Sequence, residues 1–202
     1  MTSFVIACTL FWAAVSLPES PDTLAKKELM DCCNAMRVSI QNIESGPRKL
    51  AFDIYLFNTK PGTPMELAGF QAGILLDYNW FELVSARNIE VTIKSGSSAL
   101  NPEQAPESIS VVEPGIIRIA AKRPPGPGNG SIISSKSHGT RVCRVIITLR
   151  NLVSVLPSVL AGFTGSRDST LFPTRISFYT GNTNQPCTII PGINAFTGDP
   201  PK

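Results

Sequence analysis

Residues 49–59, KLAFDIYLFNT, decide the fold of this chain. Apolar residues recur there at every second position, namely Leu50, Phe52, Ile54 and Leu56. A period of two matches a β-strand, whose side chains point alternately to opposite faces of a sheet, whereas a helix would scatter these residues around its circumference. One face of this strand is therefore a core face, and the rest of the chain must supply partners for it.

The composition favours one domain built from short strands. The chain has 202 residues, of which 43% are hydrophobic and 16% charged, so it can bury a substantial core. Seventeen prolines and fifteen glycines are typical of strands joined by turns rather than of a helical protein. The net charge is +3 and the basic residues are scattered, so nucleic acid is not an expected partner.

Similar strand patterns recur along the chain, separated by glycine- and proline-bearing turns. They lie at residues 36–41, 66–77, 89–94, 109–112, 117–122, 141–150 and 175–180. We find no convincing amphipathic helix of useful length, since Pro157 would interrupt one within the apolar stretch 152–163. Strands without intervening helices imply antiparallel pairing, so the sequence predicts an all-β sandwich or barrel of eight or nine strands.

The strand register predicts which side chains form the core. The residues expected to be buried are Phe52, Ile54, Ile89, Val91, Ile93, Ile119, Ile147 and Phe178. Cys143 shares the inward register of its strand, which predicts a buried, inert thiol. Asp53 and Tyr55 occupy the intervening positions, so we expect both side chains to point away from the core.

The N-terminal residues indicate export. Residues 4–15 form an apolar run without charge, followed by Ser16. This run is too short to span a membrane and is typical of a secretory signal peptide, although a lipoprotein signal at Cys8 is an alternative. We expect a signal peptide at residues 1–16, a flexible leader at 17–31, a folded domain at 32–190 and a C-terminal tail at 191–202.

Export also bears on the cysteines. Cleavage after Ser16 would leave Cys32, Cys33, Cys143 and Cys187. Exported proteins can form disulfides, and the two ends of a compact domain often lie close together. Cys33 precedes the first strand and Cys187 follows the last, so a disulfide between Cys33 and Cys187 is compatible with this arrangement.

The order of the segments resembles a known family. LAFDIYLFNT at residues 50–59, followed by ELAGFQAGILLDYN at 66–79, resembles the opening of cohesin-like modules. IIRIAAK at 116–122 and GTRVCRVIITLR at 139–150 resemble the later strands of that group. The resemblance covers roughly residues 34–180 and is closest to the cohesin-like domains of secreted, surface-sorted proteins of Bacteroidota.

This resemblance implies a nine-stranded antiparallel jelly-roll sandwich at the bacterial cell surface. It also implies a non-catalytic role in attaching proteins or spacing other modules. Surface proteins of this group usually continue into a sorting domain, so we expect the chain to be part of a larger polypeptide. A carbohydrate-binding module is the alternative, since jelly rolls serve both uses and the fold does not fix the function.

The sequence supplies little material for catalysis or for a metal site. His138 is the single histidine, and we interpret it as a solvated loop residue because no GxSxG nucleophile motif accompanies it. The adjacent Cys32 and Cys33 lack zinc-ligand spacing, and no acidic residues form a DxDxD calcium loop. We therefore expect no enzymatic activity, no cofactor and no metal.

Two sets of residues are candidates for binding a partner. Asp53 and Tyr55 are the candidates if a sheet face is used. Tyr78 and Trp80 are the candidates if loops are used, because their position at the end of an apolar run predicts that they are exposed. Aromatic side chains could instead cap sheet edges or pack under loops. Three coplanar exposed aromatic rings would favour a sugar ligand, and a flat face of mixed polarity would favour a protein.

Overall fold

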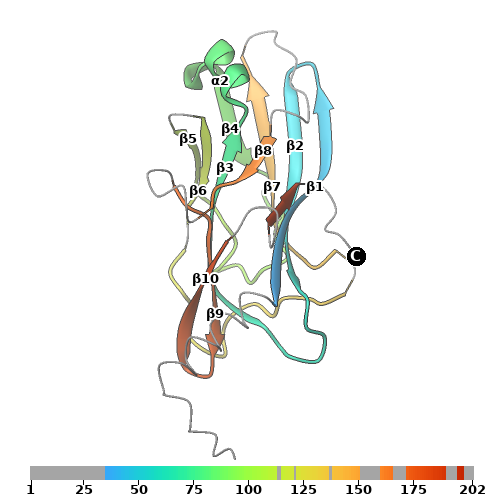
Figure 1. Cartoon of the computed structure of the whole chain (residues 1–202), viewed down its shortest axis with the longest axis vertical. Coiled ribbons are helices and arrows are strands. Elements are labelled where there is room, and N and C mark those ends of the chain that lie inside the picture. Colours follow the sequence, from blue (N-terminus) through green and yellow to red (C-terminus); the bar gives the residue numbers. More distant parts are fainter. Residues whose placement is uncertain are drawn as a thin grey trace, which may run out of the picture.

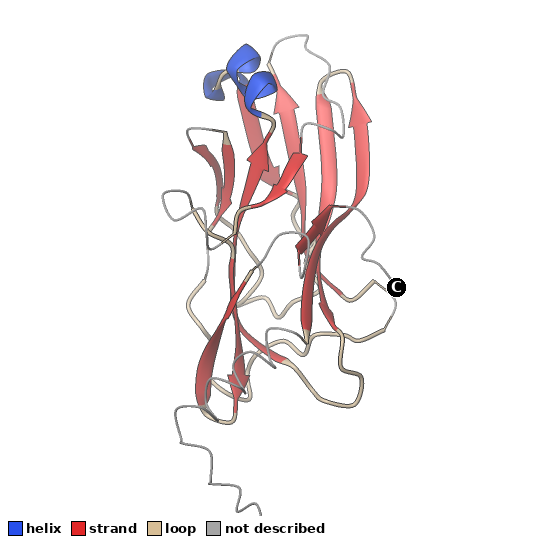
Figure 2. Cartoon of the chain, viewed as in Figure 1, coloured by secondary structure: helices blue, strands red, loops and turns tan. Residues whose placement is uncertain are grey.

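The chain folds into an all-β sandwich, as predicted (Figure 2). The computed structural model describes residues 35–112, 115–120, 122–136, 138–150, 160–165, 172–189 and 195–197. The predicted signal peptide, the leader and Cys33 lie outside these residues. Two sheets face each other, and their inward-pointing apolar side chains form one continuous core.

The first sheet has five strands and places the segment from residues 49–59 at its centre. In spatial order its strands are β11 (Ala195–Thr197), β1 (Met36–Gly46), β2 (Lys49–Asn58), β7 (Thr140–Leu149) and β4 (Ile89–Ile93). Neighbouring strands are antiparallel, except that β11 runs parallel to β1. Strand β2 is therefore hydrogen-bonded on both sides, and β4 forms one edge of the sheet.

The second sheet covers the inward face of the first. Its main path is β10 (Thr183–Thr188), β9 (Arg175–Thr180), β3 (Glu66–Leu76), β6 (Ile116–Ile119) and β5 (Ile109–Val112). A further strand, β8 (Leu160–Phe163), also pairs with β3. All of these pairs are antiparallel, which confirms the predicted pairing for this sheet.

Three strands of the structure were not predicted. β8 and β11 are only four and three residues long, too short for alternation to be recognised. β10 contains Pro186, a residue that argues against a strand unless the strand lies at an edge, as β10 does. β11 falls within residues 191–202, the segment interpreted as a tail, and it joins the first sheet beside β1.

The expectation of no useful helix was wrong at one end of the sandwich. Helix α2 (Tyr78–Val84) follows β3, and a 3-10 turn (Ala86–Asn88) leads from it into β4 (Figure 1). The Asp77 side chain caps the helix by accepting a hydrogen bond from the backbone N–H of Trp80 at 2.8 Å. Two turns of helix are too few for a helical period to stand out from the preceding apolar strand.

Most of the predicted core is confirmed. Phe52, Ile54, Ile119, Ile147, Phe178 and Ile89 are buried. Val91 and Ile93 were also expected to be buried but are only partly so, because β4 lies at the edge of its sheet and has a neighbouring strand on one side only. The prediction correctly identified the inward face of β4 and overestimated how well that face is covered.

The predicted buried thiol is confirmed at Cys143. This residue is fully buried, and burial, together with the nearby charge of Asp53, raises the pKa of the thiol to about 12. Cys187 is also buried, with 3% of its surface exposed. Because Cys33 is outside the described residues, the Cys33–Cys187 disulfide stays a prediction.

A glycine allows close packing where β3 meets β8. The Gly73 carbonyl accepts hydrogen bonds from the Thr174 hydroxyl at 3.0 Å and from the backbone N–H of Thr164 at 2.8 Å. The Gly73 N–H in turn donates to the Thr174 hydroxyl at 3.1 Å. A Cβ atom at this position would overlap the Phe172 carbonyl oxygen and the Thr164 hydroxyl.

We predict that Gly73→Ala will destabilise the domain by about 3 kcal/mol, because the overlap involves backbone that cannot move aside. Gly46→Ala is the matched control, since the nearest atom to a Cβ there is 3.9 Å away. Urea denaturation should show a lower midpoint for Gly73→Ala and a nearly unchanged midpoint for Gly46→Ala. Equal midpoints for the two variants would contradict the close approach.

The raised pKa of Cys143 predicts a loss of stability in alkali. In the unfolded chain the thiol ionises near its ordinary pKa of 9.0, whereas the folded thiol stays protonated up to about pH 12. Between these values the folded state binds more protons than the unfolded state, so the free energy of unfolding falls as the pH rises. Urea denaturation at increasing pH above 9.0 should show a steeper decline for the native chain than for Cys143→Ala. Parallel declines would refute this assignment.

Candidate binding surfaces

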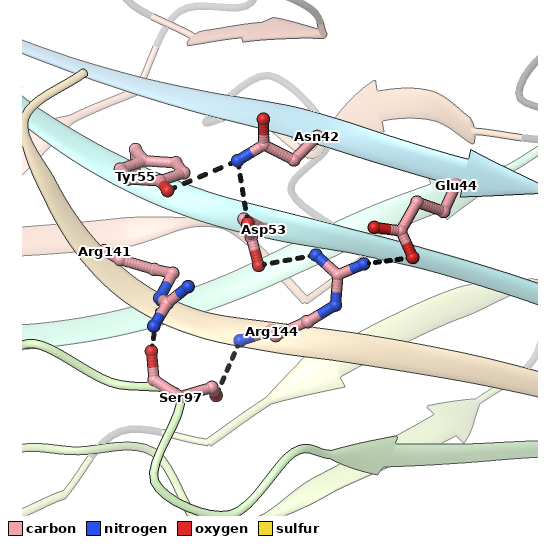
Figure 3. A network of polar contacts seen from close by, with 7 residues as sticks. All are labelled: Asn42, Glu44, Asp53, Tyr55, Ser97, Arg141 and Arg144. Carbon is pink, nitrogen blue, oxygen red and sulfur yellow. Dashed lines mark hydrogen bonds and ion pairs between the residues drawn. The ribbon is translucent and has the colours of Figure 1, made fainter.

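Asp53 lies in a polar network on the outward face of the first sheet (Figure 3). One carboxylate oxygen accepts a hydrogen bond from the Arg144 guanidinium on β7 at 3.1 Å. The other accepts from the Asn42 side-chain amide on β1 at 2.8 Å. Both oxygens are therefore bonded, and only 2% of the residue is exposed.

The local backbone explains why these groups meet. Antiparallel pairing places Asp53 directly opposite Arg144 across β2 and β7. On the other side, the register of β1 against β2 shifts between Gln41 and Glu44, and Asn42 lies within this bulge with a φ of 50°. The extra residue of the bulge turns the Asn42 amide towards Asp53.

Arg144 connects this network to the edge of the sheet. Its guanidinium also forms an ion pair with Glu44 at 2.6 Å, and its backbone N–H donates to the Ser97 hydroxyl at 2.9 Å. Burial lowers the pKa of Arg144, but hydrogen bonds and charges from Asp53 and Glu44 outweigh it, so the net shift is upward. The Arg141 side chain donates to the Ser97 carbonyl, which fixes the loop after β4 against β7.

The structure therefore corrects the prediction for Asp53. Its position in the strand was assigned correctly, but its side chain is enclosed by partners from the neighbouring strands and is not available to a ligand. Tyr55 is half-buried on the same face. Its hydroxyl accepts from Asn42 at 3.3 Å, and its ring centroid lies 6.3 Å from that of His138. His138 itself is exposed, as predicted for a loop histidine.

The second candidate pair, Tyr78 and Trp80, is divided by helix α2. Tyr78 is 59% exposed, but Trp80 is 9% exposed and belongs to the core, so the prediction that Trp80 is exposed was wrong. Trp80, Phe81 and Val84 form the inward side of the helix. The Phe81 ring lies against Gly115, the residue before β6, which anchors the helix to the second sheet.

Sequence reasoning missed the most exposed apolar residue of the described part, Leu83. It is 81% exposed on the outward side of α2, close to Tyr78 in the chain. The Tyr78 hydroxyl forms a hydrogen bond with Glu82, which raises the pKa of Tyr78. A helical period anchored on Trp80, Phe81 and Val84 would have identified Leu83 as outward-facing. We call the outward group Tyr78, Asn79, Glu82 and Leu83 the α2 surface.

The described aromatic residues do not form a platform for sugar rings. Among the tyrosine, tryptophan and phenylalanine side chains whose burial the structure describes, Tyr78 is the exposed one. Tyr55 is half-buried on the first sheet, whereas Tyr179 is half-buried on β9 of the second sheet, where its hydroxyl accepts from the Gly126 N–H at 2.8 Å. With Trp80 buried, the structure brings no three candidate rings together within its described residues.

The described residues contain no group of three or more histidine, cysteine, aspartate or glutamate side chains placed to bind a metal ion. None of the helices in that part of the chain is long and apolar enough to cross a membrane. The buried Asp53 carboxylate is bonded to Arg144 and Asn42.

Comparison with known proteins identifies two similar solved structures. Both are of the endoglucanase CelQ from Clostridium thermocellum, complexed with cellotetraose in one case and with cellobiose and cellotriose in the other. The first has a TM-score of 0.40 and 15% sequence identity, and the match covers 89% of this chain. The second has a TM-score of 0.38 and 14% sequence identity, and the match covers 78% of this chain. The matched regions are 28% and 26% of the CelQ chains. No protein-family model and no curated protein matches the sequence.

We predict that Asp53→Asn will destabilise the domain by about 3 kcal/mol, because the largely buried guanidinium of Arg144 then loses its buried carboxylate partner. Glu44→Gln is the matched control, since the Glu44 side chain is 72% exposed and its ion pair should contribute about 1 kcal/mol or less. Urea denaturation at neutral pH measures both changes. A larger loss for Glu44→Gln than for Asp53→Asn would show that Asp53 is not the main partner of Arg144.

Proposed function

We propose that this chain is an exported, non-catalytic module that attaches to a protein partner at the bacterial cell surface. The observation that carries the proposal is the α2 surface, where Tyr78 and Leu83 are exposed on a helix whose opposite side is anchored in the core. The resemblance of the sequence to cohesin-like modules supports the same role.

Because these two side chains are exposed in the free chain, burying them against a partner would contribute to the free energy of binding. Burying a leucine side chain contributes about 1.5–3 kcal/mol, and tyrosine is among the residues most often found at the energetic centres of protein interfaces. The cap and the buried side of the helix already hold the backbone that carries both side chains. A partner would therefore lose little ordering entropy when it binds.

The polar residues of the α2 surface limit the chemistry of the partner. Glu82 and Asn79 are exposed beside Leu83, and Glu82 already accepts a hydrogen bond from Tyr78. A complementary protein would present an apolar recess for Leu83 and hydrogen-bond donors at its rim. This division into an apolar centre and a polar rim is usual for protein interfaces.

The geometry favours a protein over a polysaccharide. Sugar rings stack on flat, exposed aromatic faces, and the strongest candidate for such a face, Trp80, belongs to the core. A leucine projecting from a helix offers no flat face. The proposed absence of catalysis is supported by Asp53, whose carboxylate is bonded through both oxygens to Arg144 and Asn42.

We predict that the double variant Tyr78→Ala/Leu83→Asp will lose binding to the partner by at least about tenfold, because it removes both apolar contacts. The partner is first captured on the immobilised chain from the cell envelope of the source organism and then purified. Isothermal titration calorimetry with the purified partner compares the native chain, the double variant and Ile132→Ser. Ile132 is the matched control, since it is 60% exposed and lies outside the α2 surface.

Three outcomes would contradict the proposal. Equal affinity of the native chain and the double variant would show that the partner binds elsewhere. Saturable binding to an isolated polysaccharide, lost in the double variant, would assign the α2 surface to sugar recognition. Saturable turnover of glycan or ester substrates by the purified chain, lost on changing His138, would show that the chain is an enzyme.

A further inference from the structure

Strand β4 forms an edge whose backbone groups are available for pairing. It pairs with β7 on one side, and no other described strand pairs with it. The backbone N–H of Lys94 bonds to Arg144 at 2.9 Å, and the Asn88 carbonyl accepts from Arg150 at 3.0 Å, so the even-numbered positions point towards β7. Because these directions alternate along a strand, the N–H and C=O groups of the odd-numbered positions point outward.

The side chains along this edge also alternate. Glu90, Thr92 and Lys94 are exposed on the outward face of the sheet. Val91 and Ile93 lie on the inward face, where they are only partly covered. Within the described residues, neither Glu90 nor Lys94 forms an ion pair. Their charged groups, on either side of the Thr92 hydroxyl, are therefore available to a neighbouring strand.

We propose that β4 of a second copy of this chain pairs with β4 in antiparallel orientation, with the two-fold axis passing through Thr92. Thr92 then faces Thr92 of the second copy, and Glu90 faces Lys94 in both directions. Val91 faces Ile93 on the inward side, again in both directions. The pairing is thus complementary in charge, in hydrogen bonding and in apolar contact.

The hydrogen-bond directions allow this register. Val91 and Ile93 both have outward-pointing backbone groups, so the pair of Val91 with Ile93 can exchange N–H···O bonds. Glu90 and Lys94 then form a non-hydrogen-bonded pair, in which the Cα atoms are about 4.5 Å apart and the side chains are closest. Opposite charges in such a pair stabilise a sheet. Registers with the axis through Val91 or Ile93 do not place Glu90 opposite Lys94.

One edge of the second sheet, strand β10, provides a contrast. β10 contains Pro186, which lacks a backbone N–H and is a common means of preventing edge-to-edge association. β4 has no proline and no glycine. Its outward face carries one negative charge, at Glu90, and one positive charge just after the strand, at Lys94. Edge-to-edge pairing through five residues would bury less than the standard interface of about 1,600 Å², so the self-association should be weak and concentration-dependent.

The test is a reciprocal charge reversal measured by sedimentation equilibrium of the whole chain. Glu90→Lys turns each facing charge pair into two lysines, and Lys94→Glu turns each into two glutamates. Either variant alone should therefore dimerise about tenfold more weakly than the native chain. A mixture of the two variants should form heterodimers, because both facing pairs then place a lysine of one chain opposite a glutamate of the other. The double variant Glu90→Lys/Lys94→Glu should recover the native dissociation constant.

Lys136→Glu is the matched control for a change in net charge, since Lys136 is an exposed lysine outside β4. Its self-association should equal that of the native chain. A native chain that remains monomeric up to millimolar concentration would overturn the proposal. Single variants that dimerise as tightly as the native chain, or a mixture that forms no heterodimers, would do the same. Each result is independent of the α2 surface, because none of the substituted residues belongs to it.

Discussion

The structure depends on the pairing of β2 with a strand on each side. Its inward residues are fully buried, and its backbone bonds to β1 and β7 fix where the outward residues meet their neighbours. The same registers bring Asp53 opposite Arg144 and place Asn42 within a bulge beside it. One alternating segment therefore sets both the apolar core and the polar network on the opposite face.

Alternation predicted the inward faces of the long strands, because whether a side chain faces the core there depends only on its position along its own strand. It could not predict the environment of Asp53, since enclosure on an outward face depends on partners such as Arg144, distant in the sequence. The prediction for Trp80 failed for a different reason. A helical turn after β3 reassigns which side chains face inward, and the signal for that turn was the single cap Asp77.

Two different surfaces of the sandwich follow from these constraints. The α2 surface exists because Trp80 and Phe81 tie a short helix to the end of the core, which leaves Leu83 without cover. The β4 edge exists because the first sheet ends there, and its inward residues are covered only in part. The proposed attachment to another protein and the proposed pairing with a second copy involve separate residues, so neither excludes the other.

The parallel pairing of β11 with β1 has a mechanical consequence. These strands come from opposite ends of the described chain, and Val38, Ser39 and Ile40 face Ala195, Phe196 and Thr197. Tension that pulls the start of β1 and the end of β11 apart acts along both strands in opposite directions. All the bonds of the pair then bear the load together instead of opening one after another. A module joined in this way to neighbouring domains would resist stretching by shear, which suits a component that transmits force.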